Sequence, residues 1–399
     1  MPTIFEPARI GRLEMKNRLV RSATHEGMAD GNGAPTGEHQ RLYRRLAEGG
    51  VGLIITGHAY VSPEGGSARM NGMHRDDLVP PWKELVESVH GHGAKIAVQI
   101  NHLGGMASEK ETGLAPVAPS AVKYPMTGET PREMTSDDVE RIAADFGRAA
   151  RRAREAGFDA VQLHGAHAYL ASQFLTPATN RRKDEWGGSP ENRFRFAGRV
   201  LAGIRAAVGA DYPVLVKLSA YDLARDGGIK LEDGIAFACM AVRAGADAIE
   251  VSAGTVAGVM ATVRGDVPYD AILEGVPELK ERPVRRFVAD KLIRRALKPL
   301  PFASCYNREA GKLVKARVGV PVILVGGMND PAVMEEIVAQ GEADFIAVCR
   351  ALILDPGWPE KIRLGDRAPS KCLHCNRCMF SLGSTWVRCH YGKADAPAG

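Results

Sequence analysis

The sequence FDAVQLHGAHAYLASQFLTPATNRRKDEWGGSPENR occupies residues 158–193, and it begins as a buried strand. Its first six residues form a short apolar run, which is typical of a strand covered on both faces. Two histidines and a tyrosine, His164, His167 and Tyr169, follow where this strand ends. In parallel α/β proteins the catalytic groups gather at the carboxyl ends of the strands. This stretch therefore predicts a parallel α/β fold with a site at the end of the strand.

Seven further apolar runs of this kind lie along the chain, with amphipathic helical stretches between them. The eight predicted strands are RLVRSA (18–23), GLIITG (52–57), KIAVQI (95–100), DAVQLH (159–164), PVLVKLS (213–219), AIEVSAG (248–254), PVILVGG (321–327) and DFIAVC (344–349). One helix is predicted over 136–157 with Ser136 as its N-cap, and another over 330–341, ending at Gly341. Eight β/α units predict an α/β fold of the TIM (β/α)8 barrel type, followed by a C-terminal extension that carries a cysteine cluster.

We expect residues 1–365 to form the barrel and residues 366–399 to form the extension. A long loop at 103–135 follows the third strand, and an insertion at about 264–303 separates the sixth strand from the seventh. Between Glu278 and Lys298 the insertion has eight Lys and Arg against three acids. Such a charge run is usually a solvated face. The alternative is a docking surface or a lid over the barrel mouth.

The bulk composition excludes several classes of protein. Of the 399 residues, 45% are hydrophobic and 25% are charged, which is ordinary for a globular protein. The net charge of +5 is spread along the chain, so nucleic acid is not indicated as a partner. No apolar run reaches the roughly 18 residues of a membrane span, and no secretory signal is visible. These features predict a cytoplasmic protein without a membrane or nucleic-acid partner.

Polar residues and glycines at other strand ends indicate a cofactor. Gly326 and Gly327 follow the seventh strand and Arg350 follows the eighth, which suits a phosphate because glycine admits backbone N–H groups and arginine supplies a forked charge. Gln99 on the third strand can pair with the polar edge of a flat ring, and Lys217 on the fifth can offset negative charge on it. GxGxxG and GxxxxGK[ST] motifs do not occur. FMN fits this pattern.

The C-terminal cysteines indicate a metal site. Cys372, Cys375, Cys378 and Cys389 lie within CLHCNRCMFSLGSTWVRC, with the spacing C-x2-C-x2-C-x10-C. Four thiolates suit a [4Fe–4S] cluster or an all-cysteine Zn²⁺ site. Three close cysteines and a distant fourth favour iron–sulfur, because zinc sites usually come as two CxxC pairs. Both metals remain candidates.

With these motifs the chain resembles the old yellow enzyme family of FMN-dependent ene-reductases. Its nearest-looking branch contains 2,4-dienoyl-CoA reductase, trimethylamine dehydrogenase and enoate reductases. The resemblance covers about residues 2–390 and is most specific in 164–196, in PVILVGG and in NRLVRSATHEG (17–27). It implies substrate-oxygen ligands at His164 and His167, a proton donor at Tyr169, and a [4Fe–4S] cluster at the four cysteines. The FMN contacts that it implies are Ser22, Ala23, Thr24, Gly57, Gln99, Lys217, Gly326, Gly327 and Arg350.

Three positions depart from the family pattern. Lys217 stands where the family usually has arginine. The positive charge is kept, but the paired N–H donors of a guanidinium group are lost. Gly105, within QINHLGG, also replaces a usual arginine, and Cys349 precedes Arg350 where glycine is common. None of these changes removes the predicted catalytic set.

The expected activity is FMN-dependent reduction of an activated C=C bond in a small enone, enoate or enoyl thioester. Reduced FMN would give hydride to the β-carbon, with Tyr169 as proton donor. The reductant is expected to be NAD(P)H or a separate electron-donor protein, because the FAD and nicotinamide domain of that branch has no counterpart in this sequence. The family resemblance also favours a homo-oligomer.

Two alternative functions remain open. One is a flavin and iron–sulfur amine dehydrogenase or demethylase that passes electrons to a partner. The other is a flavin-free barrel isomerase or aldolase with a structural zinc.

Overall fold

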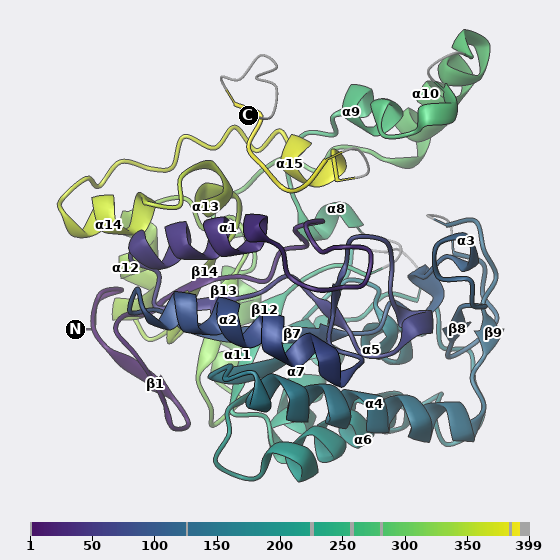
Figure 1. The fold of residues 1–399 in the computed structure, drawn as a ribbon, viewed down its shortest axis with the longest axis horizontal. Helices are drawn as coiled ribbons and strands as arrows, with labels where there is room; N and C mark the ends of the chain where they lie inside the picture. Colours follow the sequence, from purple (N-terminus) through teal and green to yellow (C-terminus); the bar gives the residue numbers. More distant parts are fainter. Residues whose placement is uncertain are drawn as a thin grey trace.

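Eight parallel strands close into a barrel at the centre of the molecule (Figure 1). This computed structural model describes residues 2–124, 127–223, 227–255, 259–279, 282–382 and 385–391. The barrel strands are β3 (Leu19–Arg21), β4 (Leu53–Ile55), β7 (Lys95–Asn101), β10 (Ala160–Gly165), β11 (Val214–Ser219), β12 (Ala248–Ser252), β13 (Val322–Val325) and β14 (Phe345–Val348). Their order is β10-β11-β12-β13-β14-β3-β4-β7, and β7 pairs back with β10. The predicted barrel and its eight strands are confirmed.

Helices surround the barrel because their apolar faces pack on the outward side chains of the strands. The longer helices are α1 (Gly37–Glu48), α2 (Val79–His90), α4 (Ser136–Glu155), α6 (Pro190–Val208), α7 (Leu231–Arg243), α10 (Pro283–Ala296), α11 (Arg308–Lys315) and α12 (Pro331–Ala339). The shorter helices are α3 (Glu109–Thr112), α5 (Leu170–Leu175), α8 (Val259–Thr262), α9 (Tyr269–Glu274), α13 (Arg350–Leu354), α14 (Trp358–Arg363) and α15 (Arg377–Phe380). Within the described ranges, no helix is both long enough and apolar enough to cross a membrane.

The start of α4 corrects one prediction. Its N-cap is Thr135 and not Ser136, because Thr135 Oγ1 accepts a hydrogen bond from the backbone N–H of Asp138. The Asp138 carboxylate in turn accepts from the backbone N–H of Thr135, which completes a capping box. With Ser136 as the N-cap, the residue three places later would be Val139, whose side chain has no hydrogen-bond acceptor for a capping box. The helix predicted over 330–341 is present as α12, which is capped by Asp330 and ends at Ala339, two residues before the predicted end at Gly341.

A hairpin closes the barrel at the amino ends of its strands. It consists of β1 (Ala8–Ile10) and β2 (Leu13–Met15), which pair antiparallel. Ile10, Leu13 and Met15 are buried and pack with the inward residues at the start of the barrel strands. The hairpin leaves the opposite end, where the strands terminate, as the open end of the barrel.

The insertion and the extension both lie at the open end. In the insertion, α9 leads to α10, which extends away from the barrel at the upper right of Figure 1. The extension runs back over the barrel mouth, and its α15 lies near α9 (Figure 1). Val387 N donates to Glu26 O at 2.8 Å, which ties the extension to the segment after β3. The loop at 103–135 contains α3 and a short parallel pair, β8 (Val117–Ala118) and β9 (Arg132–Glu133).

Candidate active site

A cavity of about 440 Å³ opens where the barrel strands end. Residues from all eight barrel strands or the loops that follow them line it, together with residues of the cysteine extension. It brings together most of the predicted site residues: Ser22, Ala23, Thr24, Gln99, His164, His167, Tyr169, Lys217, Gly326 and Arg350. Gly327 lines an adjoining lobe, which shares Gly326 and Arg350 with the main cavity. Long-range folding has therefore gathered positions that the sequence keeps far apart.

Gly57 lies outside the lining of the cavity, and packing explains why it is glycine. Its N–H donates to Glu26 Oε1 at 3.0 Å, and a Cβ atom there would lie 1.7 Å from Glu26 Oε2. The buried Glu26 carboxylate also accepts hydrogen bonds from Arg21 and Tyr43. The contact of Gly57 with FMN stays a prediction.

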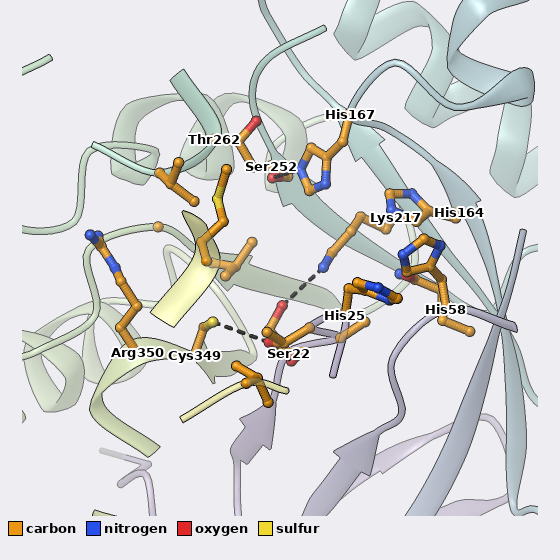
Figure 2. A pocket seen from close by; sticks show the side chains of 18 of the residues that line it. Ser22, His25, His58, His164, His167, Lys217, Ser252, Thr262, Cys349 and Arg350 are labelled. Atoms are coloured by element: carbon orange, nitrogen blue, oxygen red, sulfur yellow. Dashed lines mark hydrogen bonds between the residues drawn. The ribbon is translucent and has the colours of Figure 1, made fainter. Parts of the chain in front are cut away.

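Polar side chains form a connected layer on the cavity floor. Lys217 Nζ donates to Ser22 Oγ at 2.9 Å and lies 3.1 Å from Glu250 Oε1 (Figure 2). Gln162 Nε2 donates to Glu250 Oε2 at 2.7 Å, and Gln99 Nε2 donates to Gln162 Oε1 at 2.7 Å. An ammonium group has three N–H donors, so Lys217 keeps one for a ligand above it.

Sequence reasoning missed Glu250 and Gln162. Both lie inside apolar strands, and Glu250 is the register partner of Lys217 on the neighbouring strand. An acidic residue within AIEVS was the available signal, because an inward polar residue of a barrel strand needs a partner across the barrel.

The histidines and Tyr169 form one aromatic group at the end of β10. The rings of His164 and His167 lie 5.1 Å apart, and the ring of Tyr169 lies 4.7 Å from His164. His58, from the end of β4, lies 4.9 Å from the ring of Tyr169, and His25 lies 4.9 Å from His58. Figure 2 shows the four histidines on one side of the cavity and Arg350 on the other. The group offers several polar hydrogens to one small region.

Hydrogen bonds orient the two predicted substrate ligands. Ala166 N donates to His164 Nδ1 at 3.4 Å, which leaves Nε2 as the protonated nitrogen of a neutral ring. His167 Nε2 lies 2.7 Å from Ser252 Oγ. If the serine hydroxyl donates in that contact, Nδ1 of His167 carries the hydrogen. His167 and Ala168 have φ of 58° and 69°, so two left-handed residues turn the chain sharply after β10.

Burial decides the protonation of this group. It lowers the pKa of His167 to about 3, with a further contribution from the positive charge of Lys217. It also holds the pKa of His164 well below the usual range, and there the neighbouring His167, His58 and Lys217 add to the effect. Burial raises the pKa of Tyr169 to about 12. At neutral pH the imidazoles are therefore neutral donors and the phenol keeps its proton.

The other end of the cavity suits a phosphate. Gly326 and Gly327 have φ of 127° and 71°, which other residues rarely adopt, and they expose backbone next to Arg350. Arg350 Nη1 donates to Arg264 O at 2.8 Å and to Asn376 Oδ1 at 2.7 Å. Cys349 Sγ lies 3.1 Å from Thr24 Oγ1, between this end and the floor. A polar floor for a ring and a glycine–arginine end for a phosphate fit FMN.

The four C-terminal cysteines are neighbours without a closed metal geometry. None of them forms a disulfide. Burial raises the pKa of the Cys372 thiol, and it raises the pKa of Cys378 to about 12. Tyr391 N donates to Cys389 Sγ at 3.4 Å. In the described part of the chain, no three such ligands converge closely enough to hold a metal ion.

Comparison with known proteins identifies the family. Residues 3–271 and 288–367 match the NADH:flavin oxidoreductase / NADH oxidase family. The chain belongs to this family. An NADH oxidase of Thermoanaerobacter brockii is 38% identical over 379 residues, which are 94% of this chain and 53% of that protein. The chain thus spans about half the length of this relative.

Solved structures of similar proteins share the fold. A 2-naphthoyl-CoA reductase in complex with 2-naphthoyl-CoA has a TM-score of 0.82 and 27% identity, covering 97% of this chain and 56% of that one. The old yellow enzyme homologue from Zymomonas mobilis has a TM-score of 0.71 and 27% identity, covering 92% of this chain and 94% of that one. The resemblance to old yellow enzymes is therefore confirmed.

Proposed function

We propose that this chain is an FMN-dependent oxidoreductase that reduces an activated C=C bond of an enone, enoate or enoyl thioester. The observation that carries the proposal is the grouping of His164, His167 and Tyr169 at one end of a cavity whose other end suits a phosphate. Family membership supports a flavin in this cavity. FMN, when bound, supplies the two-electron chemistry, taking hydride from NAD(P)H and giving it to the substrate.

The floor and the far end would hold the cofactor. Ser22, Gln99 and Lys217 would contact the flavin ring, and Gly326, Gly327 and Arg350 would bind its phosphate. Of the other predicted contacts, Ala23 and Thr24 also line the cavity.

The two histidines would bind the substrate carbonyl. Both rings are neutral at neutral pH, so each carries one N–H donor. With the Ser252 hydroxyl donating to His167 Nε2, His164 through Nε2–H and His167 through Nδ1–H can donate to one oxygen. Two donors fixed before the reaction stabilise the negative charge that develops on that oxygen and draw electron density from the alkene. They also orient the substrate relative to Tyr169.

Tyr169 would deliver the proton to the α-carbon. We expect Tyr169→Phe to slow substrate reduction about 10²- to 10⁴-fold, the usual contribution of a positioned general acid. Flavin reduction by NAD(P)H is expected to stay close to that of the unmodified protein, because it needs no proton from the phenol. Stopped-flow absorbance at the flavin band measures the two half-reactions separately.

The outcome that opposes this assignment is an equal loss in both half-reactions. Tyr60→Phe is the matched control, because this tyrosine packs on His74 outside the cavity lining. Bleaching of the flavin by added amines, without NAD(P)H, would instead support the amine dehydrogenase alternative. A flavin-free aldolase needs an unpaired amine at the barrel centre, whereas Lys217 is paired with Glu250 and Ser22.

The cysteine extension would bind a [4Fe–4S] cluster. The cysteine spacing and the N–H group directed at Cys389 Sγ support this reading. The four sulfurs must draw closer together to do so, and Zn²⁺ is the alternative. Iron and zinc analysis of anaerobically purified protein decides between the two metals.

An acidic electron-donor protein would dock on the arm formed by α10. The family match omits residues 272–287, so part of this arm is additional to the common fold. The arm connects to the cysteine extension, because Arg377 forms an ion pair with Asp270 at the start of α9. The cytoplasmic location and the homo-oligomer stay predictions.

A further inference from the structure

Asn376 connects the cysteine extension to the barrel mouth. It lies between Cys375 and Arg377, and only 1% of its surface is exposed. Its Nδ2 donates to Val263 O at 2.8 Å and to Asp266 O at 2.9 Å, in the segment that begins the insertion. Its Oδ1 accepts from Arg350 Nη1 at 2.7 Å. The amide is therefore fully used in joining the extension, the insertion and the residue after β14.

The backbone at Asn376 suits this position. Its φ is 57°, in the left-handed region that asparagine tolerates better than most residues. That turn follows Cys375 and directs the side chain inward, where Asn376 itself lines the main cavity. The conformation and the three hydrogen bonds together fix the position of the amide.

The Arg350 guanidinium is anchored through one of its nitrogens. Nη1 donates to Arg264 O and to Asn376 Oδ1, and the guanidinium carbon lies 5.8 Å from the centre of the Phe302 ring. No protein partner of Nε or Nη2 occurs in the described part of the chain. An arginine binds phosphate best through two parallel N–H groups. The anchoring of Nη1 thus leaves the Nε–Nη2 edge available to a phosphate next to Gly326 and Gly327.

We infer that Asn376 is a positioning residue for the flavin phosphate, acting through Arg350. The inference rests on the proposed function, since it requires FMN in this cavity. Under this inference, the segment that carries Cys375 and Asn376 affects FMN affinity through the phosphate and not through the flavin ring. Asn376 makes no contact with the reacting atoms and is not catalytic.

The test compares two flavins that differ only by the phosphate. Asn376→Gly removes the amide and keeps the left-handed backbone accessible. The dissociation constants of FMN and riboflavin are measured by flavin fluorescence on flavin-depleted protein, with metal content determined on the same samples. We expect FMN to bind about tenfold more weakly in the variant, the size of one lost hydrogen bond to a charged group. Riboflavin affinity is expected to change less than about twofold, because riboflavin has no phosphate for Arg350 to bind.

Asn180→Gly is the matched control. Asn180 is also buried, and its Nδ2 also donates to two backbone carbonyls, those of Phe174 and Trp186, but it lies outside the cavity lining. Its loss is expected to leave the ratio of FMN to riboflavin affinity unchanged. Equal losses for both flavins in Asn376→Gly, or no loss, would overturn the inference.

A second comparison is used if riboflavin binds too weakly to measure or if Asn376→Gly folds poorly. For this purpose Asn376→Ser is added, and each substitution at residue 376 is also made in an Arg350→Gln background. There the change at residue 376 should have little further effect on FMN affinity, because the residue through which it acts is gone. A full effect in that background would also overturn the inference. If the unmodified protein binds neither flavin, the proposed function fails and not the role of Asn376 alone.

Discussion

Glu250 places a negative charge at the centre of the barrel. Its side chain has no exposed surface, and that of Lys217 is only 3% exposed. Hydrogen bonds from Ser22 and Gln162 satisfy the carboxylate, which a buried ion pair requires if it is to be tolerated. The charge that Lys217 presents to a flavin is thus balanced from below by Glu250.

This pairing predicts a strong effect on stability. We expect Glu250→Gln to lower the free energy of unfolding by about 3–5 kcal/mol, because it leaves the Lys217 ammonium buried without its counter-charge. Lys217→Met combined with Glu250→Gln should recover part of that loss. Urea unfolding followed by circular dichroism measures the free energy of unfolding of four proteins: the unmodified protein, Glu250→Gln, Lys217→Met and the double variant. Strictly additive losses would mean that the two side chains do not stabilise each other.

Helix α10 exposes an apolar surface. Val284, Phe287, Val288 and Leu292 are 77%, 61%, 50% and 62% exposed, and their spacing of three and four residues places them on one side of the helix. In the described part of the chain, the only salt bridge within α10 joins Arg294 to Asp290. Arg285, Lys291 and Arg295 therefore add positive charge to an apolar face, which suits an acidic partner with an apolar centre.

Charge reversal on α10 tests the docking proposal. In a variant with Arg285→Glu, Lys291→Glu and Arg295→Glu, we expect flavin reduction by a reduced acidic ferredoxin to slow at least about tenfold at low salt. Reduction by NAD(P)H should not change. The control reverses Arg9, Arg12 and Arg44, which are exposed in the β1–β2 hairpin and on α1.

Equal rates with the two triple variants would contradict docking at α10. Binding of the unmodified protein to anionic phospholipid vesicles, lost in the α10 variant, would assign the arm to a membrane surface.

For the whole molecule, the barrel was predictable because strands buried on both faces appear as apolar runs. The site was predictable where it depends on strand ends, as for His164 and Tyr169. The β1–β2 hairpin was missed because three-residue strands show no period. The hydrogen bonds of Asn376 were not predicted, because its partners Val263 and Arg350 are distant in sequence and leave no local pattern. The partner of Glu250 depends on strand register, which apolar runs do not specify.

The buried histidines make global stability depend on pH. Burial lowers the pKa of His102 to about 4, and it holds the pKa of His58 and His164 well below the usual range. Below pH 6.5 the unfolded chain binds protons that the folded chain does not, so stability falls as the pH drops. Each such histidine should remove about 1.4 kcal/mol per pH unit between pH 6.5 and 5.

Urea midpoints at pH 7.5, 6.5 and 5.5 measure this dependence. His58→Asn should make the fall between pH 6.5 and 5.5 shallower by about one proton's contribution. An unchanged pH dependence in that variant would mean that His58 is protonated in the folded protein.

The cavity wall joins Ser22, near one end of the described chain, with Leu382 and Val387 near the other. During synthesis the barrel can assemble as its strands emerge, because domains fold progressively from the amino-terminal side. The wall that would cover the proposed flavin forms only after the cysteine extension has been made. Stable retention of flavin would then mark chains whose translation has passed residue 387, and ribosome-bound or prematurely terminated barrels would remain colourless.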